Sequence, residues 1–223
     1  MNLHVIILAA GQGTRMKSDL PKVMHPLAGK ALAQHVVDTA SQLSPTRIHL
    51  VYGHKGEQVK AGIQSEILSL VEQSEQLGTG HAVAQALPGI EGDAQVLILY
   101  GDVPLTSVET LTQFVAMSAG KLGILTMTLP DAAGYGRIVR DERGVVTAIV
   151  EEKDATEVQK AIKEINTGIM AVSAALLTTW LPELSNNNAQ GEYYLTDIVA
   201  KAVQHGLGIV TMQLYGQSTA LFT

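Results

Sequence analysis

The 223-residue sequence contains no cysteine and only 4% aromatic residues. Without cysteine the chain has no disulfide, no thiolate nucleophile and no cysteine-based zinc site, which fits a cytoplasmic protein. Charged residues are also few, at 16%, and the formal net charge of −6 argues against nucleic acid or an anionic membrane as a partner. No apolar run approaches the roughly 20 residues of a membrane span, and no signal peptide is recognisable at the N-terminus. The 46% hydrophobic content is enough for one large domain with an aliphatic core.

Two common nucleotide-binding motifs are missing as well. There is no P-loop pattern, and Gly11-Gln12-Gly13 lacks the third glycine of the dinucleotide motif, because Met16 stands at that position. Instead, the segment LAAGQGTRM (8–16) follows an apolar run and precedes Pro21-Lys22. Its small residues allow a ligand to lie against main-chain N–H groups, while Arg15 and Lys22 supply cations for phosphates. The alternative is a tight strand-to-helix turn with an incidental arginine.

Hydrophobic periodicity predicts an α/β fold, with a Rossmann-like, mostly parallel sheet covered by helices. In residues 1–122 strands alternate with helices, which favours right-handed parallel crossovers. We expect strands at Leu3–Leu8, Arg47–Tyr52, Ser69–Gln73 and Gln95–Tyr100, and helices at Ala31–Leu43, Lys55–Leu68, Gly80–Leu87 and Val108–Ala119. In residues 123–223 short strands at Gly123–Leu129, Gly136–Arg140 and Val145–Val150 predict a small antiparallel, β-rich substrate-side subdomain, followed by helices near Ala174–Trp180 and Leu195–His205. The whole chain is therefore expected to be a single domain with two functional halves.

Polar residues at predicted strand ends are candidates for binding. Asp102 follows the strand that ends at Tyr100, where one carboxylate could hold Mg²⁺ together with phosphate oxygens; the alternative is a helix N-cap or turn aspartate. Gln73 could pair with a nucleobase edge such as that of uracil, or be an ordinary solvated glutamine. Glu151 and Asn166 could clamp sugar hydroxyls, or be turn residues. The seven histidines show no metal-ligand spacing, and we expect them to be structural or at the surface.

Taken together, these segments resemble the sugar nucleotidyltransferases. The motifs LAAGQGTRM, EQLGTGHA, YGDVPL, GYGRI, EINTGI and NNNAQGEYYLTDI occur in this order. They are similar to the N-terminal uridyltransferase (pyrophosphorylase) half of the bacterial bifunctional N-acetylglucosamine-1-phosphate uridyltransferase/glucosamine-1-phosphate acetyltransferases. The resemblance extends from about Val5 to about Val210 and implies a nucleotide-diphospho-sugar transferase fold.

The resemblance also implies roles for individual residues. Nucleotide binding is implied for the backbone at Leu8, Ala9, Ala10 and Gly11, with Gln73, Gly78 and Thr79 around the uracil and Tyr100 and Gly101 lining the pocket. Contacts to the phosphates are implied for Arg15 and Lys22, Mg²⁺ binding for Asp102, and N-acetylglucosamine binding for Gly136, Glu151 and Asn166. The implied catalytic residues are therefore Arg15, Lys22 and Asp102.

The end of the chain departs from the family pattern. After Leu214 the family continues with a Glu-Gly-Val-Asn-Asn stretch that supplies a second, asparagine-type metal ligand, and Tyr215–Thr223 contain no match for it. We also expect the C-terminal β-helix of the family, which carries acetyl transfer and trimer formation, to be absent, so that neither property carries over.

The expected reaction is transfer of a uridylyl group from UTP to N-acetylglucosamine 1-phosphate, with Mg²⁺, for cell-envelope precursor synthesis. Two alternatives remain open. The chain could use another sugar phosphate or base, or it could be a truncated, catalytically impaired binder of sugar nucleotides.

Overall fold

A nine-stranded mixed sheet forms the centre of the molecule in this computed structural model, which describes residues 2–11, 18, 20–53 and 56–214. Seven strands follow one another across the sheet in the order β11-β7-β10-β6-β1-β4-β5. The strands span Leu3–Ala9 (β1), Arg47–Tyr52 (β4), Leu68–Glu72 (β5), Gln95–Tyr100 (β6), Leu122–Thr128 (β7), Arg137–Arg140 (β8), Val146–Val150 (β9), Glu164–Ser173 (β10) and Ile209–Leu214 (β11). A separate hairpin comprises β2 (Pro26–Leu27) and β3 (Lys30–Ala31).

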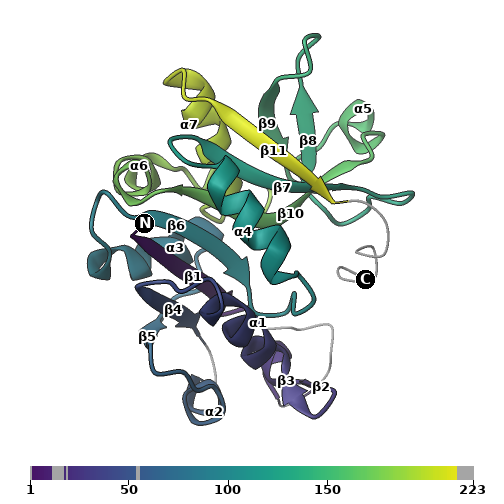
Figure 1. Ribbon diagram of the computed structural model, residues 1–223. Coiled ribbons are helices and arrows are strands. Elements are labelled where there is room, and N and C mark those ends of the chain that lie inside the picture. Colours follow the sequence, from purple (N-terminus) through teal and green to yellow (C-terminus); the bar gives the residue numbers. More distant parts are fainter. Residues whose placement is uncertain (1, 12–17, 19, 54–55, 215–223) are drawn as a thin grey trace.

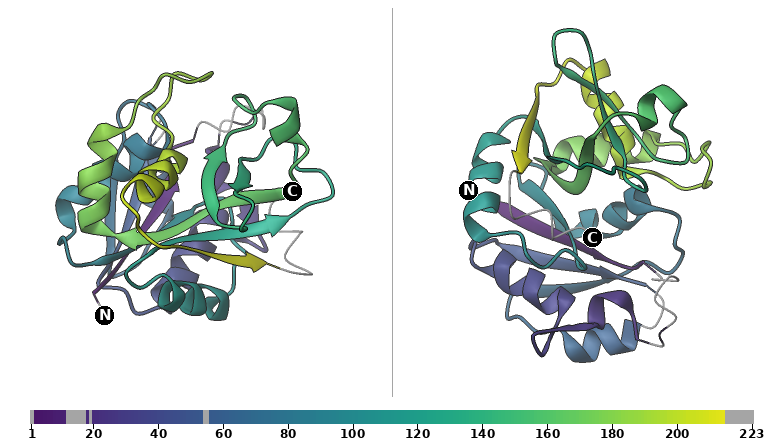
Figure 2. Two further views of the ribbon diagram at one scale, coloured as in Figure 1. Left: turned by 90° about the horizontal axis from the view of Figure 1, so that it is seen from above. Right: turned by 90° about the vertical axis from the view of Figure 1, so that its right-hand side faces the viewer.

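Helices cover both faces of this sheet (Figure 2). The α-helices span Leu32–Ser41 (α1), Gly56–Gly62 (α2), Thr79–Ala86 (α3), Val108–Met117 (α4), Glu157–Lys160 (α5), Ala174–Trp180 (α6) and Ile198–Gln204 (α7). Short 3-10 turns occupy Lys22–Met24, Leu87–Gly89, Leu181–Glu183 and Leu195–Asp197. These elements confirm the α/β class and the helix-covered, mostly parallel sheet.

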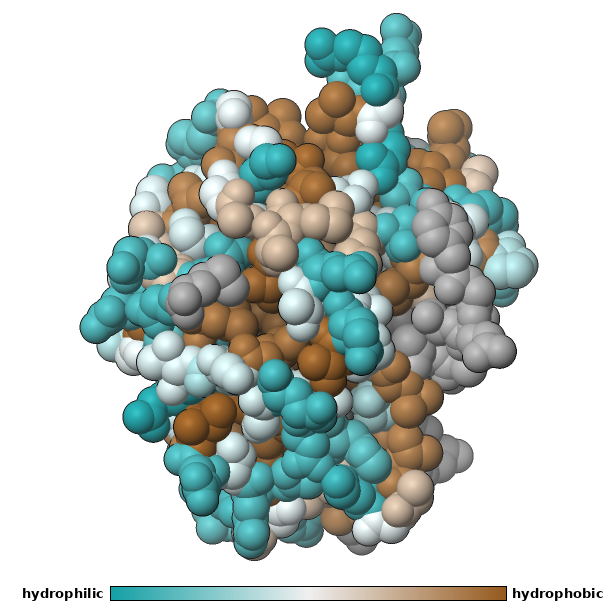
Figure 3. All heavy atoms as spheres, in the orientation of Figure 1, coloured by the Kyte–Doolittle hydropathy of each residue, from teal (hydrophilic) through white to brown (hydrophobic). Residues whose placement is uncertain are grey.

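Strand β1 shows how the core is divided between the two faces. Its side chains alternate, so that Val5 and Ile7 pack with α1, α2 and α4, whereas Ile6 and Leu8 pack with α3, α6 and α7. Every residue of β1 is buried, as expected for a central strand of a parallel sheet. The helices that pack on Val5 and Ile7 have a polar outer side. Figure 3 shows hydrophilic side chains over much of the area where α1 lies.

The second half departs from the sequence prediction in two places. The first is β7, which is not part of a separate antiparallel unit: it lies in the main sheet, antiparallel to β10 and parallel to β11. The second is β10, a ten-residue strand that the sequence analysis did not identify. Its register shifts between Asn166 and Met170, and Gly168 there has a φ of +89°. This polar, bulged segment interrupts the apolar alternation that would have revealed the strand.

Strands β8 and β9 form the expected antiparallel pair, which projects at the side of the sheet opposite to β5 (Figure 1). One helix of the first half differs from the prediction. The helix expected over Lys55–Leu68 is much shorter: the described part runs from Gly56 to Gly62, and Lys55 lies outside the described residues. A glycine at its last position and a serine soon afterwards account for the early end.

Candidate active site

The carboxyl ends of β1 and β6 lie side by side and bring the first glycine loop to the segment that carries Asp102. Leu8 is in register with Tyr100, and the N–H of Gly101 donates to the Leu8 carbonyl over 2.9 Å. A side chain at Gly101 would meet Val23 at 3.2 Å and Ala9 at 3.4 Å, so this position stays small. Ligands of open α/β sheets bind at this edge.

The loop itself is described only in part. Ala9 and Ala10 are buried and Gly11 is exposed, with open space where a side chain would stand. Residues 12–17, and with them Arg15, lie outside the described residues. The predicted phosphate contact of Arg15 therefore stays a prediction.

Lys22 and Asp102 meet at this edge. The Lys22 Nζ lies 2.6 Å from Asp102 Oδ2, and both side chains are partly exposed, Lys22 by 46% and Asp102 by 24%. Buried Val23 anchors the segment that carries Lys22. A carboxylate and an ammonium that both remain accessible to solvent suit a site that exchanges this ion pair for phosphates and a cation.

A second group of polar contacts surrounds Gln73, just after β5. The Gln73 Nε2 donates to the Gly78 carbonyl over 3.1 Å and lies 3.0 Å from His81 Nδ1. Gln73 is only 3% exposed, so it is not the ordinary solvated glutamine of the alternative interpretation. With Gly53 and Gln76, it lines a cavity of about 360 Å³ next to the ends of β4 and β5.

The loop at Gly78 and Thr79 is held by the segment before α7. The N–H of Gly80 donates to the Tyr193 carbonyl over 2.8 Å, and the Leu195 N–H donates to Thr79 Oγ1 over 3.0 Å. Gly78 has a φ of +111°, and a Cβ there would lie 2.6 Å from the Tyr193 carbonyl oxygen. Only glycine fits this position. The contacts explain how the asparagine- and tyrosine-rich segment supports the site from a distance in sequence.

Glu151 forms the opposite wall, directly after β9. Its Oε1 accepts a hydrogen bond from Thr196 Oγ1 over 3.0 Å. Burial raises the pKa of Glu151, and the nearby carboxylates of Asp197 and Asp154 raise it further, while the Thr196 hydrogen bond opposes the shift. A Cβ at Gly136 would lie 3.3 Å from both carboxylate oxygens. The bare backbone of Gly136 therefore leaves the carboxylate accessible from that side.

Asn166 lies beside Gly136 in the bulge of β10. Its N–H donates to the Gly136 carbonyl over 2.8 Å, and its Oδ1 accepts from the Gly168 N–H over 3.0 Å. These contacts bring Gly136, Glu151 and Asn166, which the sequence analysis assigned to the same ligand, into one cluster.

Tyr100 joins the two groups of residues. Its ring packs on Gly168, where any side chain would collide with it, and its side chain is hydrogen-bonded to that of Thr79. Burial raises the pKa of Tyr100, and the charges of Glu151 and Asp102 act in the same direction. Residues from both halves of the chain thus converge on one aromatic ring.

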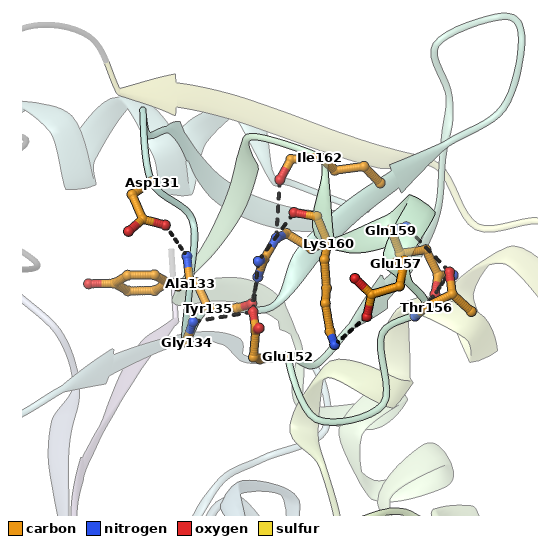
Figure 4. Close-up of polar contacts among 11 residues, drawn as sticks. Asp131, Ala133, Gly134, Tyr135, Glu152, Thr156, Glu157, Gln159, Lys160 and Ile162 are labelled. Carbon is orange, nitrogen blue, oxygen red and sulfur yellow. Dashed lines mark hydrogen bonds and ion pairs between the residues drawn. The ribbon is translucent and has the colours of Figure 1, made fainter.

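Arg137 braces the β-rich half, a role that the sequence analysis missed. Its guanidinium is 3% exposed and forms an ion pair of 2.7 Å with Glu152. It also donates to the carbonyls of Tyr135 and Ile162, the latter over 3.1 Å (Figure 4). The signal for this was its place on the buried side of β8, where a charged residue needs several partners.

His81, which the sequence analysis expected to be structural or at the surface, contacts Gln73 through Nδ1. Within the part of the chain that the structure describes, no group of three or more histidine, aspartate or glutamate side chains is arranged to hold a metal ion. No described helix is long and apolar enough to span a membrane.

The fold and the arrangement of residues at the carboxyl edge of its sheet define a nucleotidyltransferase. A model of the MobA-like NTP transferase domain matches residues 5–162, and the chain belongs to that family. In solved structures the same fold occurs in UDP-glucose pyrophosphorylase, both complexed with UDP-glucose and in the apo form. Each matches with a TM-score of 0.80 over 97% of this chain and 92% of the other, at 20% and 19% identity. At that identity the likeness shows the fold.

Closer sequence relatives are named bifunctional protein GlmU. The chain is 61% identical to GlmU of Marinobacter nauticus over 95% of its length, and 61% identical to GlmU of Pseudomonas entomophila over 96%. GlmU of Dechloromonas aromatica is 58% identical over 96% of this chain. The chain spans about half the length of these relatives, 47% or 48%.

Proposed function

We propose that the chain transfers the uridylyl group of UTP to N-acetylglucosamine 1-phosphate, giving UDP-N-acetylglucosamine and pyrophosphate. The observation that carries the proposal is the convergence on Tyr100: Thr79 lies on its nucleotide side, Gly168 on its sugar side, and the carboxylates of Asp102 and Glu151 act on it from nearby. A site that joins a nucleotide to a sugar phosphate must hold both substrates next to each other, and residues of both halves are adjacent at Tyr100.

Residues up to about 122 form the nucleotide half of this site, and the remainder forms the sugar half of the same domain. The bare backbone from Leu8 to Gly11 is where the ribose and phosphates would lie, because main-chain N–H groups and small residues allow close approach. The uracil would lie beside Gln73, Gly78 and Thr79, next to the cavity that Gln73 lines. In the sugar half, Gly136, Glu151 and Asn166 would hold the N-acetylglucosamine moiety.

Asp102 fits a role as the carboxylate ligand of Mg²⁺, because it is accessible at the sheet edge and already faces a cation, the Lys22 ammonium. Mg²⁺ typically needs only one or two carboxylates, with phosphate oxygens and water completing its shell. Bound there, the ion would neutralise charge on the triphosphate. Arg15 and Lys22 would contact the phosphates as additional cations.

The reaction itself needs no general base. A sugar phosphate has a second pKa of about 6, so one of its oxygens is already anionic at neutral pH. That oxygen forms a bond to the α-phosphorus of UTP. The bond from the α-phosphorus to the bridging oxygen of the β-phosphate breaks, and pyrophosphate leaves with this oxygen and its electron pair. The protein contributes positioning and positive charge, which dominate catalysis in phosphoryl transfer.

The high identity to the GlmU relatives supports this assignment. The product would be a precursor of the bacterial cell envelope, namely of peptidoglycan and lipopolysaccharide, made in the cytoplasm. The proposed partners are small molecules, with neither nucleic acid nor a membrane among them. Assembly into trimers and acetyl transfer are not included in the proposal.

The test is pyrophosphate release by this 223-residue chain from UTP and N-acetylglucosamine 1-phosphate, with Mg²⁺ and with a chelator in its place. A panel replaces UTP by CTP, GTP or dTTP, and the sugar phosphate by glucose 1-phosphate. Metal-dependent release that is fastest with the proposed pair supports the function. Release that is fastest with another pair assigns another substrate, and binding of UDP-N-acetylglucosamine without any release identifies a binder.

A further inference from the structure

Residues 188–196, here called the bridging segment, connect the loop before α3 with the turn after β9. The first of these belongs to the nucleotide half and the second to the sugar half. Toward the nucleotide half, the Tyr193 N–H donates to the Leu77 carbonyl over 2.8 Å, and the Leu195 N–H donates to Thr79 Oγ1 over 3.0 Å. The main chain of the bridging segment thus fixes the loop beside which the uracil is proposed to lie.

Toward the sugar half, the bridging segment uses the side chains of the alternate residues. The Tyr194 hydroxyl donates to Asp154 Oδ2 over 3.2 Å, and Thr196 Oγ1 donates to Glu151 Oε1 over 3.0 Å. The backbone of Tyr194 is extended, with φ −76° and ψ 125°, and side chains two residues apart lie on the same side of an extended chain. Consecutive residues of the segment therefore contact opposite halves.

Asp154 holds the bridging segment from the sugar half, although it is not among the residues proposed to bind the sugar. Besides the contact with Tyr194, its Oδ1 accepts a hydrogen bond from the Ala189 N–H over 2.9 Å. Its own N–H donates to the Glu151 carbonyl over 3.0 Å, which places it in the same turn as Glu151. Hydrogen bonds to a carboxylate are stronger than those between neutral groups. Asp154 thus joins the position of Glu151 to that of the segment.

Asn188 closes the bridging segment on itself. Its Oδ1 accepts from the N–H groups of Gln190 and Glu192 over 3.1 and 3.2 Å, and its Nδ2 donates to the Glu192 carbonyl over 2.6 Å. Tyr194, two residues further on, is buried. Asparagine loops of this kind are held by their own hydrogen bonds. The segment is therefore a braced link, and a shift at Asp154 moves its contacts with the other half.

We propose that Asp154 is a positioning residue that, through the bridging segment, holds the loop at residues 77–79 and the carboxylate of Glu151 at a fixed separation, so that nucleotide and sugar phosphate are aligned for transfer. The inference rests on the proposed function and deepens it. A ligand that spans both halves needs this fixed separation, whereas a ligand within one half does not. Alignment of two bound reactants contributes to kcat more than to the affinity for either reactant.

The experiment compares the wild type, Asp154→Ala and Asp154→Asn by steady-state kinetics and by calorimetric binding of UDP and UDP-N-acetylglucosamine. Alanine removes both acceptor oxygens, whereas asparagine keeps an acceptor for Ala189 and a polar group beside Tyr194. Both variants remove the charge, so that the difference between them reports the hydrogen bonds.

We expect Asp154→Ala to lower kcat about tenfold and to raise the Kd for UDP-N-acetylglucosamine about tenfold. The KM for each substrate and the Kd for UDP should stay within about threefold of the wild type, because each of these ligands needs only one half. Asp154→Asn should keep all of these values within about threefold of the wild type.

Asp141→Ala is the matched control. Asp141 also accepts hydrogen bonds from two main-chain N–H groups, but it lies in the turn between β8 and β9, at the end of the pair away from Glu151. Its replacement should leave kcat and both Kd values unchanged. If Asp154→Ala does not fold, Tyr194→Phe takes its place, since it removes one of the two contacts and keeps the ring. The same pattern is then expected, at about threefold.

The outcomes separate the inference from the proposed function. Turnover by the wild type, with kcat and the Kd for UDP-N-acetylglucosamine unchanged in Asp154→Ala, overturns the inference alone. An equal loss in Asp154→Asn also overturns it, because the charge would then be responsible. A rise confined to the KM for the sugar phosphate overturns it as well, because Asp154 would then belong to the sugar site. A wild type that neither binds nor forms UDP-N-acetylglucosamine overturns both proposals.

Discussion

The two halves of the molecule contribute different kinds of groups to the candidate site: mainly backbone and amide groups in the first half, and a partly buried carboxylate in the second. In the half that we propose to bind the nucleotide (the nucleotide half), the sheet edge presents main-chain groups around Gly11 and Gly101 and the amide of Gln73, all at the ends of parallel strands. In the half that we propose to bind the sugar (the sugar half), the carboxylate of Glu151 follows an antiparallel strand pair, where Arg137 forms an ion pair with Glu152. Backbone groups need little support beyond their strands, whereas a buried charge needs compensating partners. The sugar half should therefore be the more sensitive half to changes of charge.

The largest expected effect lies where the halves meet. Asp102→Asn removes the proposed metal carboxylate and the partner of Lys22, 2.6 Å away. We expect kcat to fall by a factor on the order of 10³ and the Mg²⁺ concentration for half-maximal rate to rise. Rates of pyrophosphate release across a Mg²⁺ titration measure both. An unchanged Mg²⁺ dependence would remove Asp102 from the metal site.

Arg137→Met should destabilise the sugar half. The change leaves the carbonyls of Tyr135 and Ile162 without their donor and Glu152 without its counterion. We expect the free energy of unfolding to fall by about 3 kcal/mol, measured by urea denaturation. The matched control, Glu152→Gln, keeps the guanidinium and should lose less. If the affinity for UTP falls as much as that for the sugar phosphate, the two halves are not separable.

A buried histidine pair in the nucleotide half predicts a pH dependence of stability. His4 Nδ1 lies 3.0 Å from His49 Nε2, and burial lowers the pKa of His49 from 6.5 to about 4, helped by the charge of nearby Arg47. His49 is therefore neutral when folded and takes up a proton on unfolding below pH 6.5. The free energy of unfolding should fall by up to about 3 kcal/mol as the pH drops from 6.5 toward 4.

The difference between wild type and His49→Leu isolates this contribution, because the carboxylates of both proteins titrate alike. Urea denaturation at several pH values between 7.5 and 4 should give a shallower slope for the variant. Parallel curves for the two proteins would contradict the assignment.

The smallest expected effects come from two variants, one in each half, that test whether the two substrates bind to separate halves. Glu151→Gln keeps an acceptor for Thr196 but loses the charge, and should raise the KM for the sugar phosphate about tenfold while leaving that for UTP unchanged. Gln73→Ala should do the reverse. Initial rates with each substrate varied in turn measure both. Variants that each raise both KM values equally would show that the halves do not bind separately.

The sequence was sufficient to predict that the loops after β1 and β6 lie at the same edge of the sheet. Both strands are continuous apolar runs, and the loops that follow parallel strands share one edge. The ion pair between Lys22 and Asp102 at this edge was not predicted, because Lys22 comes well after the end of β1. The contact of Gly136 with Glu151 could not be predicted as readily, because it depends on the register of β8 against β9. Register in short strands depends on tertiary packing and leaves little trace in local sequence.

The missed strand β10 has a similar cause. Asn166 and Gly168 interrupt its apolar pattern because the chain bulges there to present polar groups, and the φ of +89° at Gly168 requires glycine. A functional distortion thus conceals the element that carries it. The contact of His81 with Gln73 is a tertiary one between α3 and the end of β5, and the residue order does not contain that information.

The most direct test of the account is to identify the product formed from UTP, N-acetylglucosamine 1-phosphate and Mg²⁺ by ³¹P NMR and mass spectrometry. We predict equal amounts of UDP-N-acetylglucosamine and pyrophosphate, formed in proportion to enzyme and abolished in Asp102→Asn. Pyrophosphate with UMP instead of the sugar nucleotide would contradict the claim that the two halves form one transfer site, as would unconsumed UTP.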